Sequence, residues 1–230
     1  MQELTIIITA GGVGKRMGAE VPKQFILLNS KPILLHTLER FYSLFPDAQY
    51  IITLPDGFID DWKKLCLDAG STINHQTITG GKERFDSVKN ALALASGKNI
   101  MIHDGVRPLV SHSTLTNGLE ALKEFNSAIP VIAPNESIRE IKVDETKSVN
   151  RDNYLLVQTP QCFRVAIIKN AYNLPFQNSF TDDASVVEFG GEKIHVFEGN
   201  KENIKITNPS DLAYAEFLLK MDKNSYSSTD

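Results

Sequence analysis

The stretch that determines the fold runs from residue 4 to residue 24 and reads Leu-Thr-Ile-Ile-Ile-Thr-Ala-Gly-Gly-Val-Gly-Lys-Arg-Met-Gly-Ala-Glu-Val-Pro-Lys-Gln. It begins with an apolar, β-branched run typical of a buried strand, which leads directly into a glycine-rich turn. Without Cβ atoms, glycines at 11, 12 and 14 let backbone N–H groups approach anionic oxygens. The stretch also carries three cations: Lys15, Arg16 and Lys23. We therefore predict a phosphate-binding loop after the first strand.

Two better-known phosphate loops fit this stretch poorly. The Walker A pattern G-x-x-x-x-G-K-[ST] does not occur in it. The dinucleotide fingerprint G-x-G-x-x-G starts at Gly12 and Gly14, but Met17 stands where its third glycine belongs. A glycine turn after a strand can also be an ordinary connection to a helix. The cations and the following Pro22-Lys-Gln favour phosphate binding.

Composition indicates one globular α/β domain with room for a large core, since 42% of the 230 residues are hydrophobic and 23% charged. A net charge of −4 and a pI near 5.8 argue against general binding of nucleic acid or anionic membranes, which need a broad basic face. Cys66 and Cys162 lie far apart, and the five histidines lack the spacing of a zinc site. With no secretory leader and no membrane-length apolar run, we expect a cytoplasmic protein without a membrane partner.

Short β-rich runs alternate with amphipathic stretches through the first half of the chain. Strands are expected at 4–9, 49–54, 72–78 and 99–103, and helices at 32–45, 58–69, 84–95 and 113–125. This alternation predicts a Rossmann-like α/β fold, a mostly parallel sheet with helices on both faces. Ligands of such sheets bind beyond the carboxyl ends of the strands.

The alternation stops near Pro134. Residues 135–154 are polar and partly alternating, which predicts a β-hairpin arm that projects from the sheet. A lone hairpin is marginal in water, so we expect the arm to pack on a second subunit. Beyond it we expect helices at 165–172, 182–189 and 210–219, and strands at 193–197 and 203–207. Residues 1–222 would form one domain, followed by a disordered tail at 223–230.

The segment from His103 to Pro108 places a carboxylate and a guanidinium at the carboxyl edge of the predicted sheet. Asp104 could hold Mg²⁺ on a polyphosphate, and Arg107 could fork onto a second phosphate. A structural ion pair or a helix cap is the other interpretation of Asp104. His103 is more typical of a structural residue.

Three further signals are weaker. Gly80-Gly81 opens a predicted helix, so its free N–H groups could meet a base or ribose with Ser87 beside them, although such glycines often form plain turns and Arg84 could be an ordinary surface residue.

Single polar residues later in the chain are also ambiguous. Thr159 could bond a substrate hydroxyl or phosphate, or be structural. Lys205 would be a phosphate cation if it lies beside Lys23, and an ordinary solvated lysine elsewhere.

Six motifs occur in the order found in one enzyme family. They are Ala10-Gly-Gly-x-Gly-x-Arg-Met-Gly with Pro22-Lys-Gln, Gly80-Gly-x-x-Arg-x-x-Ser-Val, His103-Asp-x-x-Arg-Pro, Gln158-Thr-Pro-Gln, Thr181-Asp-Asp-Ala and Asn203-Ile-Lys-Ile-Thr. From about residue 4 to residue 217 the chain resembles the 2-C-methyl-D-erythritol 4-phosphate cytidylyltransferases of isoprenoid synthesis. The resemblance implies a homodimer, joined through the arm, that uses Mg²⁺ to transfer a cytidylyl group from CTP to methylerythritol phosphate.

The resemblance also implies roles for individual residues. Contacts to cytidine and ribose would come from Ala10, Gly11, Gly12, Gly80, Gly81 and Ser87. The catalytic cations on the CTP phosphates would be Arg16, Lys23 and Lys205. The acceptor would meet Asp104, also the metal ligand, with Arg107 and Thr159, and would meet Ser137 and Arg151 of the partner subunit. Gly11 and Ser137 stand where alanine and threonine are usual in the family.

Three alternatives stay open at this point. Ribitol 5-phosphate cytidylyltransferases share most of these motifs. A nicotinamide-dependent oxidoreductase would need the glycine that is missing at position 17. A non-catalytic nucleotide sensor would not need both Lys23 and an arginine for an acceptor phosphate. Because a phosphate monoester has a second pKa of about 6, cytidylyl transfer needs no general base, in agreement with the residues found.

Overall fold

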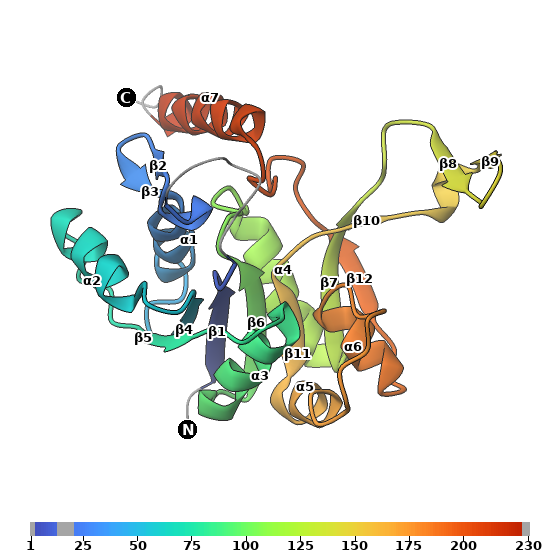
Figure 1. Ribbon diagram of the computed structural model, residues 1–230, viewed down its shortest axis with the longest axis horizontal. Helices are drawn as coiled ribbons and strands as arrows, with labels where there is room; N and C mark the ends of the chain where they lie inside the picture. Colours follow the sequence, from blue (N-terminus) through green and yellow to red (C-terminus); the bar gives the residue numbers. More distant parts are fainter. Residues whose placement is uncertain (1–2, 13–20, 227–230) are drawn as a thin grey trace.

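A computed structural model of the chain describes residues 3–12 and 21–226, with side chains up to Met221. The N-terminal run forms β1 (Leu4–Thr9), which lies in the middle of the central sheet (Figure 1). β1 pairs in parallel with β4 (Gln49–Leu54) and with β6 (Asn99–Asp104), and β5 (Gln76–Thr79) continues the sheet beyond β4. Strands β1 and β4 have the expected bounds.

The other half of the sheet contains strands that the sequence patterns did not predict. β11 (Gln161–Arg164) runs antiparallel between β6 and β7 (Ser127–Ile132), and β10 (Leu156–Val157) pairs with the later part of β7. β12 (His195–Glu198), which adds to β7 in parallel, lies close to the strand expected at 193–197. The sheet order is β10-β7-β11-β6-β1-β4-β5, with β12 on β7, so the expected mostly parallel α/β sheet is confirmed.

Helices cover both faces of this sheet, as expected. On one face lie α1 (Ile33–Tyr42), α2 (Ile59–Asp68) and α4 (His112–Glu124); on the other lie α3 (Arg84–Leu94), α5 (Val165–Ala171) and α6 (Asp183–Phe189). Side chains alternate along β1, so Ile6 and Ile8 join the core under α1 while Ile7 joins the core under α3. All three are fully buried.

Near the carboxyl edge, the segment from Lys23 to Pro32 forms a 3-10 turn, η2 (Lys23–Phe25), and two short paired strands, β2 (Leu27–Leu28) and β3 (Lys31–Pro32). Helix α7 (Pro209–Tyr226) lies above this edge in Figure 1 and packs Ala215 and Leu219 onto it. Within the part of the chain described, no helix is both long and apolar enough to cross a membrane.

Two expectations about the C-terminal region are wrong. Helix α7 extends seven residues past Leu219, where the sequence pattern ended it; residues 227–230 lie outside the described structure. The expected strand at 203–207 is an extended segment outside the sheet, with a backbone bond of 2.9 Å from Ile206 N to Val106 O. Its alternation reflects burial of Ile206 against α7 instead of pairing in a sheet.

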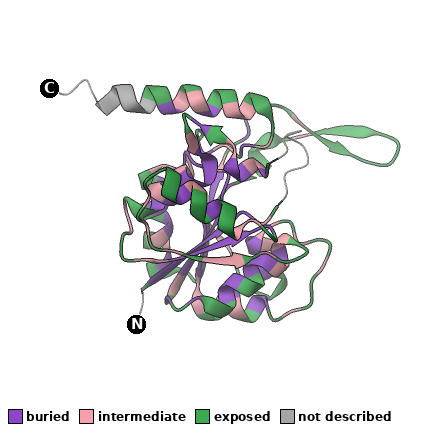
Figure 2. Ribbon diagram, turned by 60° about the vertical axis from the view of Figure 1, so that its left-hand side comes forward, coloured by how far each residue is buried: buried purple, intermediate pink, exposed green. Residues whose placement is uncertain are grey.

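The predicted arm is a hairpin of β8 (Ile138–Ile141) and β9 (Thr146–Val149), separate from the central sheet. A second 3-10 turn, η3 (Arg151–Asn153), follows it. Figure 1 shows the arm projecting from the body, and Figure 2 shows it exposed over almost its whole length. Val143 at its tip is 99% exposed.

The strand expected at 72–78 is shorter, because His75 is held in a separate contact beneath α2. Its Nε2 accepts a hydrogen bond of 2.8 Å from the indole N–H of buried Trp62, and its Nδ1 lies 2.8 Å from the Ile73 carbonyl. The ring is therefore the neutral Nδ1–H tautomer. Burial lowers the pKa of His75 below its ordinary value, although the Ile73 carbonyl opposes this effect.

We predict that His75 makes the fold sensitive to mild acid. The unfolded chain takes up the proton more readily than the folded chain, so this stabilisation is complete above the ordinary pKa of about 6.5 and is lost as pH falls towards the folded-state pKa. Urea unfolding at about pH 7.5 and about pH 5.5 should show a smaller loss of unfolding free energy for His75→Gln, which cannot titrate, than for the natural chain. Equal losses would contradict this prediction.

Candidate active site

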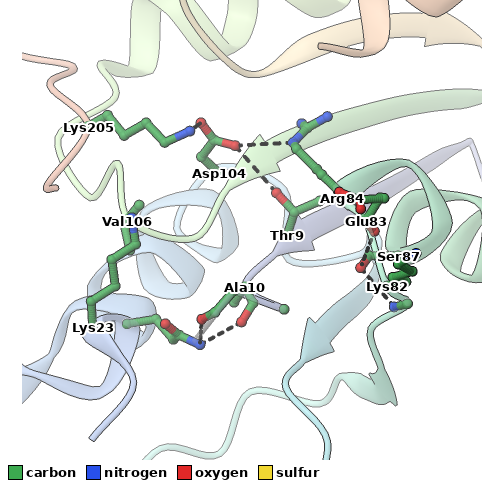
Figure 3. Close-up of a pocket in the computed structure, with 14 residues that line it drawn as sticks. Thr9, Ala10, Lys23, Lys82, Glu83, Arg84, Ser87, Asp104, Val106 and Lys205 are labelled. Atoms are coloured by element: carbon green, nitrogen blue, oxygen red, sulfur yellow. Dashed lines mark hydrogen bonds and ion pairs between the residues drawn. The ribbon is translucent and has the colours of Figure 1, made fainter. Parts of the chain in front are cut away.

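Two adjoining pockets lie beyond the carboxyl ends of β1 and β6. Figure 3 shows the first of them. The first is lined by the turn after β1, by η2 and by the start of α3. The second is lined by the turn after β6, by the connection from β10 to β11 and by the approach to α6. Both pockets share Arg84, Asp104 and Lys205, so two ligands bound there would meet at these side chains.

The glycine turns after β1 and before α3 touch each other in the first pocket. The Gly80 N–H bonds to Leu54 O at 2.7 Å, and a Cβ built on Gly80 would lie 2.9 Å from Ser87 Oγ and 3.3 Å from Gly11 Cα. Ser87 Oγ in turn accepts the Gly81 N–H at 2.9 Å. Five of the six expected nucleotide residues line this pocket: Ala10, Gly11, Gly12, Gly81 and Ser87. Gly80 packs directly against two of them.

Gln24 is a site residue to which sequence analysis assigned no role. It is 1% exposed, and its side-chain amide donates to Ala10 O at 2.6 Å and to Gly12 O at 3.2 Å. These bonds hold η2 against the glycine turn, so Lys23 lines the first pocket. The sequence signal was present in Pro22-Lys-Gln, but the partners of the amide are two backbone oxygens that no residue pattern reveals.

Asp104 is the centre of charge in both pockets. Its Oδ2 lies 2.9 Å from Lys205 Nζ and 3.3 Å from Arg107 Nε, and its Oδ1 lies 3.6 Å from Arg84 Nε. Burial by itself would raise the pKa of Asp104, but the charges of Arg84, Lys205 and Arg107 outweigh it and hold this pKa far below its ordinary value. The carboxylate stays ionised and keeps three cations close together, where they can face anions.

Arg84 is not the ordinary surface residue that the sequence allowed. Its guanidinium forms two bonds, of 2.8 and 2.7 Å, with the buried carboxylate of Asp183. The Tyr172 hydroxyl donates to the same carboxylate at 2.6 Å. Arg84 is therefore fixed between α3 and α6. Its Nε lies 3.6 Å from Asp104 Oδ1, where the two pockets adjoin.

The second pocket brings together the three residues expected to meet the acceptor within one subunit: Asp104, Arg107 and Thr159. Ser137 and Arg151 line neither pocket. Both are exposed, and the Arg151 guanidinium donates to the Asn135 carbonyl at the base of the arm. Arg16 lies outside the described residues.

A metal ion held by the protein fits these residues poorly. Within residues 3–12 and 21–226, no group of three His, Cys, Asp or Glu side chains is placed to hold a metal. The oxygens of Asp104 already face Lys205, Arg107 and Arg84.

Comparison with known proteins agrees with this geometry. The sequence model of the 2-C-methyl-D-erythritol 4-phosphate cytidylyltransferase family matches residues 4–221. A relative of that name from Bacteroides fragilis is 46% identical over 216 residues, which cover 94% of this chain and 99% of the relative. Another, from Clostridium perfringens, is 41% identical over 226 residues, covering 96% and 100%.

Solved structures show the same fold. The 4-diphosphocytidyl-2C-methyl-D-erythritol synthase of Anaerococcus prevotii superimposes with a TM-score of 0.82 at 26% identity, covering 95% of this chain and 96% of that one. The 2-C-methyl-D-erythritol 4-phosphate cytidylyltransferase of Thermus thermophilus has a TM-score of 0.77 at 29% identity, with coverage of 95% and 100%. With matches in sequence and fold over nearly its whole length, this chain belongs to the 2-C-methyl-D-erythritol 4-phosphate cytidylyltransferase family of nucleotidyltransferases.

Proposed function

We propose that this chain transfers a cytidylyl group from CTP to 2-C-methyl-D-erythritol 4-phosphate and releases pyrophosphate. The observation that carries the proposal is the pair of pockets that share Arg84, Asp104 and Lys205. The first has the glycine turns that suit a nucleotide, and the second has the arginine that suits an acceptor phosphate. Family membership supports this assignment over ribitol phosphate, nicotinamide chemistry or nucleotide sensing.

The proposed chemistry needs no side chain to remove a proton. A phosphate oxygen of the acceptor forms a bond to the α-phosphorus of CTP, and the bond from that phosphorus to the β-phosphate oxygen breaks with its electron pair on pyrophosphate. The acceptor phosphate is ionised at neutral pH, its second pKa being about 6. The main barrier to this reaction is the electrostatic repulsion between CTP and the acceptor phosphate. We propose that Lys23 and Lys205 reduce this repulsion, together with Arg16, whose role is inferred from the sequence.

Magnesium enters this proposal as part of the substrate, MgCTP, with phosphate oxygens as its ligands. We expected Asp104 to be a metal ligand, but its ion pairs with Lys205 and Arg107 favour a different role for this carboxylate. We propose that it aligns Lys205 and Arg107 at the boundary between nucleotide and acceptor.

We also propose that the arm completes the acceptor pocket of a second subunit. The chain exposes apolar side chains at the arm tip, Ile141 and Val143, and in the segment that follows the arm, from Tyr154 to Val157. Exposed apolar surface of this extent supports burial against another protein. Ser137 and Arg151 are expected to reach the partner's acceptor phosphate.

The reaction is tested by pyrophosphate release from purified protein with MgCTP. We expect release with methylerythritol 4-phosphate and at least about tenfold lower kcat/KM with ribitol 5-phosphate, a difference of about 1.4 kcal/mol in transition-state binding. Reactions with UTP or without acceptor are the controls. Equal or faster turnover of ribitol 5-phosphate would assign the alternative substrate, and no release with either acceptor would refute the proposal.

The two pockets predict different kinetic effects for the loss of Arg107 and for the loss of Lys23. Arg107→Ala should raise KM for the acceptor by about tenfold or more and leave KM for CTP nearly unchanged, because a charge-assisted bond contributes about 1.5–3 kcal/mol. Lys23→Ala should instead lower kcat by about 100-fold or more, the effect of losing one preorganised donor to the developing charge. Steady-state kinetics with each substrate varied would show both. Arg107→Ala acting equally on both substrates would count against the acceptor role.

Subunit mixing tests the arm. In a dimer of one Lys23→Ala subunit and one Arg151→Ala subunit, one site would combine an intact Lys23 with an intact arm. Each variant alone should be nearly inactive, and an equal mixture should regain about a quarter of normal activity, because half of the dimers are mixed and each has one intact site. Absence of rescue despite subunit exchange shown by native mass spectrometry would argue for an arm that serves its own subunit.

A further inference from the structure

His103 is a buried histidine whose two ring nitrogens are both used. The residue is 0% exposed and its ring packs edge-on against Phe41, with 4.8 Å between ring centroids. Nε2 lies 3.0 Å from the Arg107 carbonyl, and Nδ1 lies 2.9 Å from the Thr159 hydroxyl. From its place in the sequence, this histidine is typical of a structural residue.

The partners determine where each proton lies. A carbonyl oxygen can only accept, so the proton of the ring is on Nε2. At about pH 7.5, above the ordinary imidazole pKa of about 6.5, the ring is neutral and Nδ1 must accept. The Thr159 hydroxyl therefore donates to Nδ1, and the same oxygen accepts the Asp104 N–H at 3.2 Å.

The hydrogen bonds continue from His103 and return to Thr159. Arg107 donates from its guanidinium to Asn203 O at 2.7 Å, and Asn203 Nδ2 donates to Thr159 O at 2.8 Å. The circuit joins the end of β6, the connection from β10 to β11 and the segment that leads to Lys205. These three segments supply Asp104, Arg107, Thr159 and Lys205 to the second pocket.

We propose that His103 is a positioning residue that holds the acceptor half of the site in its binding geometry without touching either substrate. Because the only proton of the Thr159 hydroxyl is committed to His103, Thr159 cannot donate to the acceptor phosphate. It can still accept a bond from a hydroxyl of the sugar alcohol, so its contribution is to orient the acceptor. The identity of the acceptor in this inference rests on the proposed function.

Kinetics of matched variants test the positioning role. His103→Phe keeps an aromatic ring against Phe41 but removes both hydrogen bonds. We expect KM for methylerythritol 4-phosphate to rise about tenfold or more, the size of one or two lost hydrogen bonds, with KM for CTP changed less than about threefold. Thermal melting checks the fold. Equal changes in both KM values would overturn the proposal in favour of a purely structural histidine.

A double-mutant cycle tests the direction of the Thr159 hydroxyl. Thr159→Val should raise the acceptor KM, and Thr159→Ser should restore it. Thr159→Val combined with His103→Phe should cost much less than the product of the single effects, because both changes break the same bond between Thr159 and His103. Independent, multiplying effects would show that Thr159 acts without His103 and would overturn the proposal.

Nitrogen NMR tests the same geometry without any assay of activity. In protein labelled with ¹⁵N-histidine at about pH 7.5, His103 should show a neutral Nε2–H ring, assigned by loss of its signals in His103→Phe. His75, an Nδ1–H ring, is the internal contrast. A cationic or Nδ1–H ring at His103 would refute the inference even if the proposed reaction is correct. Absence of turnover with the expected tautomer would refute the reaction alone.

Discussion

The active site depends on one carboxylate, Asp104, and the three cations around it. Arg84, Arg107 and Lys205 come from α3, from the turn after β6 and from the approach to α7, and they would repel one another at this spacing without a shared counter-charge. Asp104 is only 7% exposed, so its removal would leave a crowded cationic group in a partly buried site. Loss of one partner of a buried ion pair costs about 3–5 kcal/mol. The cluster thus links the stability of this edge to its affinity for anions.

The parallel sheet explains why such a cluster can form. β1, β4 and β6 run in the same direction, and their register places Thr9 beside both Thr53 and Asp104. The carboxyl ends of these strands therefore deliver the glycine turn and the acidic turn to one edge. Gln24 and His103 hold these turns through buried bonds to backbone oxygens, so the charged side chains are positioned before any substrate arrives. Preorganised charge of this kind costs no reorganisation during reaction.

The proposed dimer would add one more side to this arrangement. Ser137 and Arg151 lie on an exposed arm that contacts neither pocket of its own subunit, and apolar residues 154–157 follow it at the surface. A hairpin of two strands has too little buried surface to be stable alone. In the proposed dimer, assembly and acceptor binding would depend on the same segment.

The sequence by itself determined the elements whose signals are local. Periodicity placed β1 and β4 at their observed bounds and α1 to α4 within a few residues, and glycine positions marked two turns that meet at the first pocket. Local signals do not show which distant residues meet. Arg84 forms hydrogen bonds with Asp183, which is 99 positions away in the sequence. This pairing holds the arginine side chain in the lining of both pockets. Strand β11 was missed for the same reason, since it pairs with β6 and β7, which lie far from it in the sequence. Motifs named the chemistry, whereas only the tertiary structure decided which charges face one another and where each buried proton lies.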